Sequence, residues 1–457
     1  MAEDRFDLVV IGGGPGGYVA AIRAAQLGLK TAVVEKDKAG GRCLNYACIP
    51  AKTMLHTAEV LDEARNGAEI GVKTSGLELD WDALAGRRTD VSEGLESGIK
   101  MLFDKNSITY IEGEGSLTAD ADVKVGDTIY GADKVILATG SVAQPIPGTE
   151  FSERVVDTWG AWSLPEQPKK IAVAGAGASG AEIASAYIRY GTEVILIEML
   201  DQILPADDKD VVRVVERVFK KQGIEISTGT PVENVEPGPD SVKLTYGDNT
   251  AEVDYLVIAG GRRPDVDALG LADAGIALDD DTGKIAVGED QATSNPKVYA
   301  IGDLTPGPAL AHKAMEEGIV AAEAIGGQPV HPLDRDLIPA GTFCHPQVAS
   351  VGLTEAEAKE AGLDIKTAKF KLGGVGAGSV YRDRDGMVKL VVDPEFGEII
   401  GAHIVGNRAC DMIPELVAVM ALEGGYQELA RMTHPHPTIS EAILDAARAV
   451  DGWATHA

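Results

Sequence analysis

Short, uninterrupted apolar runs alternate with glycine-rich turns and alanine-rich stretches along most of the chain. Residues 6–11 (FDLVVI) and 31–34 (TAVV) flank a glycine turn and an alanine-rich segment, an order that predicts strand, helix and strand. Residues 171–174 (IAVA) and 194–197 (VILI) repeat this order. Continuous apolar runs of this length are typical of strands covered on both faces, so the pattern predicts an α/β fold with Rossmann-like parallel sheets.

The turn after the first apolar run has the spacing of a dinucleotide-binding fingerprint. Gly12 would permit the tight turn, Gly14 would let a pyrophosphate approach the backbone, and Gly17 would let the helix pack closely on the strand. Glu35 ends the second strand and would accept a hydrogen bond from a ribose hydroxyl. Because the strand, turn, helix and acid occur in order, the first unit predicts a dinucleotide site.

The second unit carries the same residues at Gly175, Gly177, Gly180 and Glu198. A carboxylate at this strand end accepts from a free 2′-hydroxyl and repels a 2′-phosphate, so Glu198 favours NAD over NADP. One functional site plus a degenerate copy is the alternative. The second copy retains all three glycines and the acid, so two dinucleotide sites are predicted.

Three later apolar runs also end in turns, at the edge of a sheet where ligands of open α/β folds bind. They occupy residues 135–141, 255–264 and 298–303, and the last ends in Asp303. From about residue 339 the glycine turns become fewer and mixed strand and helix patterns follow, with a helix expected over 441–450. This part is predicted to be a separate α+β domain.

Two cysteines, Cys43 and Cys48, lie about thirty residues after the first glycine turn. A dithiol beside a bound dinucleotide is a two-electron relay between a thiol substrate and a redox cofactor. The alternatives without a catalytic role are a structural disulfide or two buried thiols. Zinc would need two further ligands at short spacing, which the neighbouring sequence lacks, so no metal site is expected.

A second candidate for chemistry is the pair His434 and His436, which alternate with Pro435 and Pro437. The segment could bind a metal, form a rigid loop, or present a base. Glu441 follows His436 by five residues, close enough to orient one ring nitrogen and leave the other as a base. Proline restricts the backbone here, and the His436–Pro437 bond could be cis.

Composition narrows the class of protein. The chain has 457 residues, enough for two or more domains, with 45% hydrophobic residues and a formal net charge of -30. Such a charge disfavours nucleic-acid and membrane partners. A halophilic source, an ordinary acidic cytosolic enzyme or a basic protein partner could each explain it. No apolar run reaches the length of a membrane span, and residues 6–11 are too short for a signal-peptide core, so a cytoplasmic protein is expected.

Taken together, these motifs resemble those of the disulfide-containing flavoprotein reductases (class I pyridine nucleotide-disulfide oxidoreductases), and most closely the dihydrolipoamide dehydrogenases. The resemblance covers essentially the whole chain. It rests on the Cys43–Cys48 segment, both fingerprints, Ala138-Thr139-Gly140, Tyr299-Ala300-Ile301-Gly302-Asp303 and His434-Pro435-His436-Pro437-Thr438-Ile439-Ser440-Glu441.

This resemblance implies an enzyme that oxidises protein-bound dihydrolipoamide and reduces NAD⁺, with FAD as cofactor. It implies a homodimer, whose lipoyl substrate comes from another protein of a 2-oxoacid dehydrogenase complex or of the glycine cleavage system. The expected domains are 1–147 (FAD, with the redox disulfide), 148–268 (NAD), 269–336 (FAD, second part) and 337–457 (dimerisation).

The resemblance also implies roles for single residues. The expected catalytic residues are the redox pair Cys43 and Cys48, the base His436 with its partner Glu441, and Lys52 with Glu182 beside flavin and nicotinamide. The expected FAD contacts are Gly12, Gly14, Gly17, Glu35, Lys52, Gly115, Thr139, Gly140, Ser141, Asp303 and Ala311. The expected NAD contacts are Gly175, Gly177, Gly180, Glu198, Val235 and Gly261.

Several positions depart from the family pattern. Arg42 stands where a small residue is more common, Tyr46-Ala47 where a glycine usually precedes the second cysteine, and Ala51 and Pro435 replace a common serine and alanine. None of these changes removes a reacting group. They bear on the choice of substrate more than on the class of reaction.

Related reductases offer alternative functions. Glutathione-type reductases usually prefer NADP, and mercuric reductases carry a C-terminal cysteine pair that residues 451–457 lack. Soluble transhydrogenases lack the first cysteine pair, and coenzyme A disulfide reductases use one redox cysteine. An inactive flavoprotein subunit of a multienzyme complex is the alternative from another class; the complete set Cys43, Cys48, His436 and Glu441 argues against it.

Overall fold

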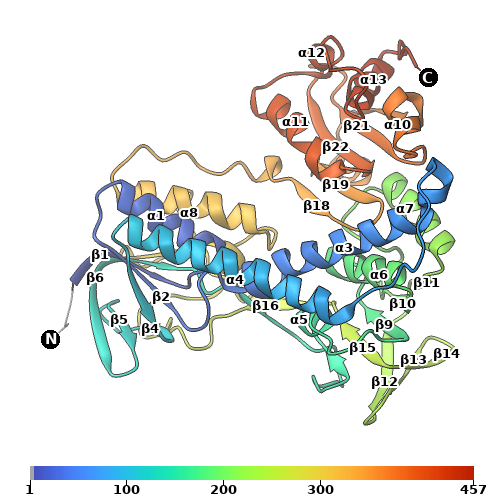
Figure 1. The fold of residues 1–457 in the computed structure, drawn as a ribbon. Coiled ribbons are helices and arrows are strands. Elements are labelled where there is room, and N and C mark those ends of the chain that lie inside the picture. Colours follow the sequence, from blue (N-terminus) through green and yellow to red (C-terminus); the bar gives the residue numbers. More distant parts are fainter. Residues whose placement is uncertain (1–4, 457) are drawn as a thin grey trace. The chain divides into compact units, whose positions relative to one another are not determined.

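The computed structural model describes residues 5–456, whose helices and strands are drawn in Figure 1. The chain divides into two compact units. The first unit consists of the chain up to Met54, Asp80–Gln144 and Gly261–Leu333. The second consists of Leu55–Leu79, Pro145–Gly260 and the chain from Asp334 onward. Within residues 5–456 no helix is both long and apolar enough to cross a membrane.

A mainly parallel sheet forms the centre of the first unit. Its parallel part has the order β3-β2-β1-β6-β17, and two short antiparallel strands, β5 and β4, continue from β6. The strands are β1 (Arg5–Ile11), β2 (Thr31–Glu35), β3 (Thr109–Glu112), β4 (Gly115–Leu117), β5 (Val123–Val125), β6 (Thr128–Leu137) and β17 (Val298–Ala300). A separate two-stranded ribbon pairs β7 (Ser141–Ala143) with β16 (Arg262–Pro264).

Both faces of this sheet are covered, which explains why its strands are apolar throughout. Leu8 and Val10 pack with helical residues in one core, and Val9 and Ile11 belong to another. Side chains alternate between the faces of a strand, so a strand buried on both sides needs no polar positions. Helices α1 (Pro15–Gln26) and α8 (Ala311–Ile325) lie side by side (Figure 1), and α4 (Trp81–Lys105) packs with α1.

The second unit holds a five-stranded parallel sheet of order β11-β10-β9-β15-β8. Its strands are β8 (Val155–Val156), β9 (Lys170–Ala174), β10 (Glu193–Ile197), β11 (Glu225–Ser227) and β15 (Tyr255–Ile258). The associated helices are α5 (Thr158–Trp162), α6 (Ala178–Tyr190) and α7 (Lys209–Gln222). A small antiparallel sheet joins β12 (Val232–Pro237), β13 (Val242–Tyr246) and β14 (Asn249–Val253).

The C-terminal part of the same unit is an antiparallel sheet of order β18-β19-β22-β21-β20 packed with helices, as the predicted α+β domain requires. The strands are β18 (Ala340–Thr342), β19 (Gln347–Gly352), β20 (Lys366–Lys371), β21 (Met387–Val392) and β22 (Ile399–Gly406). The helices are α9 (Glu355–Glu360), α10 (Gly376–Val380), α11 (Ala409–Ala421), α12 (Tyr426–Leu429) and α13 (Glu441–Val450). The helix expected over 441–450 is confirmed.

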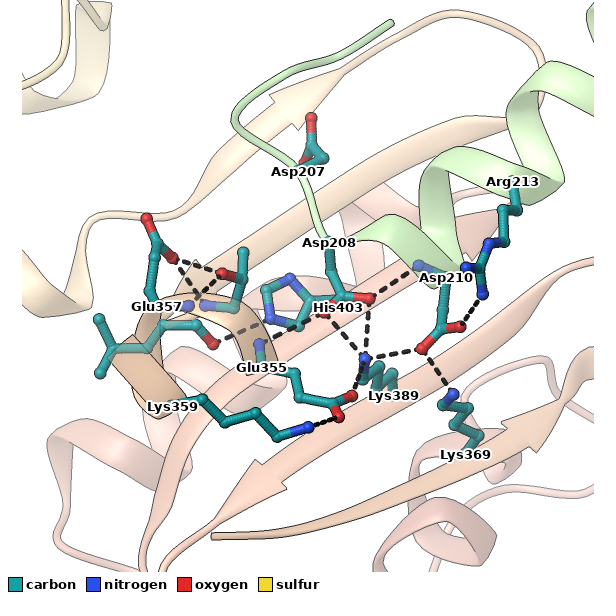
Figure 2. A network of polar contacts seen from close by, with 12 residues as sticks. Asp207, Asp208, Asp210, Arg213, Glu355, Glu357, Lys359, Lys369, Lys389 and His403 are labelled. Carbon is teal, nitrogen blue, oxygen red and sulfur yellow. Dashed lines mark hydrogen bonds and ion pairs between the residues drawn. The ribbon is translucent and has the colours of Figure 1, made fainter. Parts of the chain in front are cut away.

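A buried cluster of charges connects α7 with this antiparallel sheet (Figure 2). Lys389 on β21 is 1% exposed, and its Nζ donates to Asp208 at 2.9 Å, to Asp210 at 2.7 Å and to Glu355 at 2.7 Å. Asp208 is also the N-cap of α7, where its carboxylate accepts from the Asp210 amide at 2.9 Å. The cluster therefore fixes the start of α7 on the neighbouring sheet.

The cations keep the carboxylates of this cluster ionised. Burial disfavours the charge on Asp210, but hydrogen bonds from Lys369 and Lys389 lower its pKa to about 2. Hydrogen bonds from Lys359 and Lys389 likewise lower the pKa of Glu355 to about 2. Both pKa values lie below those of an unfolded chain, roughly 4. Their contribution to stability is therefore complete above that range and is lost as the pH falls toward about 2.

We predict that Lys389→Met lowers the free energy of unfolding at pH 7 by about 3–5 kcal/mol, because the buried Asp208 and the partly buried Asp210 and Glu355 lose their shared cation. The loss should shrink as the pH is lowered toward about 4, because protonation then removes the unbalanced charges. Urea unfolding at several pH values measures both effects. Lys369→Met is the matched control: its side chain is 44% exposed, against 1% for Lys389, so its cost should stay below about 1 kcal/mol. Equal losses in the two variants would contradict this account of the cluster.

Candidate active site

The two cysteines of the redox segment form a disulfide at the junction of two helices. Cys43 lies within α2 (Gly41–Tyr46), and Cys48 is the first residue of α3 (Cys48–Asn66). Ala47 separates the helices with φ -134° and ψ -89°, so the chain turns between the two sulfurs. The helix expected after Cys48 is present, and it carries the half-buried Lys52 one turn further along.

The first glycine fingerprint has the geometry that FAD would require. Gly12 adopts φ +106°, and an ideal Cβ on Gly17 would lie 1.9 Å from the Gly12 carbonyl oxygen, so only glycine allows α1 to begin this close to β1. A Cβ on Gly14 would meet no atom within 4 Å, which leaves the backbone open to a ligand. No side chain caps the start of α1, so its first amides can bind a pyrophosphate.

Glu35 supports this turn from the neighbouring strand. Its carboxylate accepts from the Gly13 amide at 2.7 Å and from the Asp37 amide at 2.9 Å. The residue is 8% exposed, and burial raises its pKa despite these hydrogen bonds. A carboxylate has about four acceptor positions, so positions remain for a ribose hydroxyl.

The remaining FAD candidates of the first unit gather where its strands end. Ser141 donates from its hydroxyl to the Asp303 carboxylate, and the Arg262 side chain donates to both Oγ and the carbonyl of Ser141, the Oγ contact being 2.8 Å. Arg262 was not expected from the sequence, because no local motif links it to Ser141. Asp303 lies in the short helix η2 (Gly302–Leu304) after β17, and Ala311 begins α8, whose start is not capped by a side chain.

Three other FAD candidates belong to the same unit. The Thr139 hydroxyl donates to the Asp265 carbonyl at 2.6 Å, and Gly140 adopts φ +75°. Gly115 is buried on β4, where an ideal Cβ would lie 3.0 Å from a Val34 methyl. A side chain at Gly115 would therefore crowd the sheet itself.

The second fingerprint repeats the first one closely. Gly175 adopts φ +99°, an ideal Cβ on Gly180 would lie 1.9 Å from the Gly175 oxygen, and a Cβ on Gly177 would meet nothing within 4 Å. Glu198 is 6% exposed and accepts from the Ala176 amide at 2.7 Å, as Glu35 does in the first unit. This geometry fits a second dinucleotide.

Two further NAD candidates lie elsewhere. Val235 belongs to β12 of the small antiparallel sheet, and Gly261 belongs to the first unit, where its carbonyl accepts from the Gln144 amide at 3.3 Å. Gly260, the residue before Gly261, packs on the second fingerprint: an ideal Cβ on Gly175 would lie 2.8 Å from the Gly260 Cα. The roles of Val235 and Gly261 stay predictions.

Glu182 is held by a part of the chain that the sequence did not indicate. The residue is 5% exposed on α6, and its Oε1 accepts from the Phe343 amide at 2.9 Å. One turn later, the Ser185 hydroxyl accepts from the His345 amide at 2.8 Å. These two contacts fix one face of α6 against the segment between β18 and β19. The expected pairing of Glu182 with Lys52 stays a prediction.

The two proline-flanked histidines each pair with a glutamate. His436 Nδ1 lies 2.9 Å from Glu441 Oε1, its ring is 74% exposed, and the His436–Pro437 peptide is cis, as the sequence suggested. His434 is buried, and its Nε2 lies 2.7 Å from Glu415 Oε1 on α11. Of the two rings, only that of His436 is largely exposed to solvent. Its role as the base stays a prediction.

The Glu441 carboxylate is suited to orient an imidazole. Burial opposes its charge, but hydrogen bonds from the Thr438 amide, at 2.8 Å, and from the His436 ring lower its pKa below the ordinary value. An ionised carboxylate fixes Nδ1 as the protonated ring nitrogen and leaves Nε2 free to accept a proton. The pair can thus deprotonate a thiol.

Comparison with known proteins identifies the class. Residues 6–318 match the pyridine nucleotide-disulphide oxidoreductase family, and residues 338–447 match the dimerisation domain of the same family. The chain therefore belongs to the pyridine nucleotide-disulphide oxidoreductase family, and the predicted fold class is confirmed.

Individual relatives narrow the comparison. The chain is 41% identical to the dihydrolipoyl dehydrogenase of Bacillus subtilis, with 98% of this chain and 97% of the relative aligned. It is 40% identical to the mitochondrial dihydrolipoyl dehydrogenase of Pisum sativum, over 98% and 92%. Among solved structures, LpdA from Mycobacterium tuberculosis superposes with a TM-score of 0.89 at 25% identity, over 98% and 99% of the two chains. The predicted resemblance to dihydrolipoamide dehydrogenases is confirmed.

We predict that Gly177→Ala weakens NADH binding, whereas Gly180→Ala destabilises the fold. Gly177 has φ -67° and open space around it, so alanine should change the free energy of unfolding by less than about 0.5 kcal/mol. Its methyl group should still raise KM for NADH about tenfold or more, because it occupies the ligand's approach. Gly180→Ala should instead destabilise the fold, since its methyl meets the Gly175 oxygen. Urea unfolding and NADH kinetics separate the two effects; unchanged KM in a stable Gly177→Ala protein would contradict the assignment.

Proposed function

We propose that this protein oxidises protein-bound dihydrolipoamide to lipoamide and reduces NAD⁺ to NADH. The observation that carries the proposal is the Cys43–Cys48 disulfide at the start of α3, in a chain that also holds two dinucleotide fingerprints and the His436–Glu441 pair. Relatives at about 40% identity over nearly the whole chain are dihydrolipoyl dehydrogenases, which supports this substrate.

In the proposal, FAD occupies the first fingerprint and NAD the second. The FAD-holding residues would be the open turn at Gly12–Gly17, Glu35, Ser141 with Asp303, and the start of α8 at Ala311. When bound, FAD supplies a two-electron carrier between the disulfide and the nicotinamide. Lys52 and Glu182 are assigned to the surroundings of the flavin and nicotinamide. Residues 1–147 and 269–336 would thus serve FAD, and 148–268 NAD.

The thiol chemistry needs only residues of this chain. His436 of the partner subunit takes the proton of one substrate thiol, and the resulting thiolate attacks the sulfur of Cys43. The Cys43–Cys48 bond breaks as a mixed disulfide forms between Cys43 and the substrate. The second substrate thiol then attacks the substrate sulfur of that mixed disulfide, which closes the lipoyl ring and releases Cys43, and the proton of this second thiol passes to the cysteine pair. Two electrons now rest on the cysteine pair; they pass to NAD⁺, one proton is released, and the disulfide re-forms.

The assignment of His436 to the opposite subunit requires a homodimer, and two observations support one. Residues 338–447 match a dimerisation domain, and the His436 ring is 74% exposed in the single chain. Large apolar side chains are also exposed in this part of the protein, among them Phe396 at 75% and Leu422 at 83%. We place the enzyme in the cytoplasm, where it would serve a lipoyl domain of a 2-oxoacid dehydrogenase complex or of the glycine cleavage system.

The direct test is NADH formation by the purified protein with dihydrolipoamide as donor. NADP⁺ as acceptor and reduced glutathione as donor are run beside it. Turnover confined to dihydrolipoamide and NAD⁺ is expected. Flavin that NADH reduces without any lipoamide turnover would overturn the substrate and keep the disulfide relay, and a preference for NADP⁺ would favour the glutathione-type alternative.

We predict that His436→Gln slows reduction of the enzyme by dihydrolipoamide about 10²–10⁴-fold, because the substrate thiol loses its base. Reduction by NADH should be unaffected, since no thiol is deprotonated in that half-reaction. Stopped-flow absorbance separates the two half-reactions. His331→Gln, at an exposed loop position, is the control and should behave as the wild type. Near-normal lipoamide turnover in His436→Gln would exclude this base.

We also predict that Glu198→Gln reduces the preference for NAD⁺ over NADP⁺ about tenfold or more, because the amide still accepts from the Ala176 amide but no longer repels a phosphate. The ratio of kcat/KM for the two coenzymes measures this preference. Glu193→Gln is the matched control: it lies at the opposite end of the same strand with its side chain 76% exposed. An unchanged ratio in Glu198→Gln would remove the basis of the NAD assignment.

A further inference from the structure

The turn after β17 carries Asp303, and its backbone cannot be satisfied by the sheet. Strand pairing of β17 with β6 ends at Ala300, and Gly302 then adopts φ +72°. The amide and carbonyl of Gly302 are buried, so each needs a partner other than water. Within the turn, the Gly302 carbonyl accepts from the Thr305 amide at 3.1 Å and from the Thr305 hydroxyl at 2.9 Å. The remaining partners are side chains of α8.

Lys313 and Glu317, one turn apart on α8, supply these remaining partners. The Gly302 amide donates to Glu317 Oε2 at 2.7 Å, and Lys313 Nζ donates to the Gly302 carbonyl at 2.9 Å. Lys313 also donates to the Thr305 hydroxyl at 3.0 Å and contacts the Glu317 carboxylate at 3.0 Å. The Lys313 and Glu317 side chains are 0% and 1% exposed, so all three ammonium donors act inside the protein. The pair is electrically neutral and is directed at one turn.

The adjacent stripe of α8 packs on the fingerprint helix. An ideal Cβ on Gly16 would lie 2.8 Å from the Ala314 carbonyl oxygen, and one on Gly318 would lie 2.6 Å from the Gly16 carbonyl oxygen. Backbone therefore meets backbone where α1 and α8 cross. One helix contacts the Asp303 turn through Lys313 and Glu317, and the first fingerprint through Ala314 and Gly318.

We propose that Lys313 and Glu317 are positioning residues for the flavin. They hold the Gly302–Asp303 turn and the start of α8 at a fixed place relative to α1. The pyrophosphate site at the start of α1 and the polyol site at Asp303 then lie at the spacing that one FAD molecule requires. This inference rests on the proposed function only in taking FAD as the ligand. A buried ion pair can often be replaced by apolar residues without loss of stability, so its hydrogen bonds to the turn are the reason to assign it this role.

Two double variants separate hydrogen bonding from packing. Lys313→Met with Glu317→Leu fills the space but removes the α8 partners of Gly302 and leaves its amide without the Glu317 acceptor. We expect the FAD dissociation constant to rise about tenfold or more and the flavin's visible circular dichroism to weaken. Lys313→Met with Glu317→Gln keeps a side-chain oxygen that can accept from the Gly302 amide, while Thr305 still donates to the Gly302 carbonyl. That variant should bind FAD within about threefold of the wild type, with a wild-type spectrum.

The Arg23–Glu323 pair offers a matched control, since it joins the same two helices. Arg23 on α1 contacts Glu323 on α8 at 2.6 Å, and neither has a hydrogen bond to the Gly302 turn among the contacts of residues 5–456. Arg23→Met with Glu323→Leu should leave the FAD dissociation constant within about twofold and the spectrum unchanged. FAD titration of each apoprotein, followed by fluorescence and circular dichroism, measures all three.

The outcomes are distinct. A wild-type protein that takes up no FAD overturns the proposed function. If the wild type binds FAD and the Met/Leu variant has the same affinity and spectrum, the positioning role alone is overturned. The same holds if the Met/Leu and Met/Gln variants lose equal affinity for FAD. If the Met/Leu protein does not fold, Lys313→Leu with Glu317→Met replaces it: this removes the same contacts with a different apolar packing, and unchanged FAD affinity and circular dichroism there also overturn the role.

Discussion

Both dinucleotide sites depend on the approach of a helix to the end of the strand before it. Gly17 and Gly180 allow this approach, because any side chain would lie 1.9 Å from the carbonyl oxygen of Gly12 or Gly175. With the helix that close, its first turn begins directly beyond the sheet, and its unpaired amides face the position of a ligand phosphate. Gly14 and Gly177 leave that position open. A larger residue at the contact would move the helix start and, with it, the amides.

A carboxylate from the next strand completes each turn. Glu35 accepts from the Gly13 amide and Glu198 from the Ala176 amide, each at 2.7 Å and each 22 residues along the chain. The same acid therefore supports the turn and remains available to a ribose. Because one buried carboxylate both accepts from the turn amide and faces the expected ribose, replacing this acid should disturb the turn as well as the ligand contact.

Local spacing explains which features could be predicted from the sequence. The fingerprint residues lie within one strand–turn–helix unit, and Glu441 lies five residues from His436, so chain geometry limits where they can go. The partner of Glu182 could not be predicted in this way, because the Phe343 amide lies 161 residues away. Arg262 likewise reaches Ser141 across 121 residues. Such pairs depend on how β-strands and helices assemble, and no periodicity in the chain encodes them.

Buried lysines were also beyond sequence reasoning, because a lysine within a helix or strand pattern normally indicates a solvent-facing position. Lys313 and Lys389 share a reason for being buried. Each serves a place where regular pairing stops: the turn at Gly302 after β17, and the start of α7 at Asp208. At such places backbone groups or a capping carboxylate need a partner, and a long side chain from a neighbouring element can reach them without adding bulk at the ligand edge. Many strands of parallel sheets end in such turns. A side chain that contacts the turn from the protein interior, as Lys313 contacts Gly302, leaves the solvent side of the turn open to a ligand.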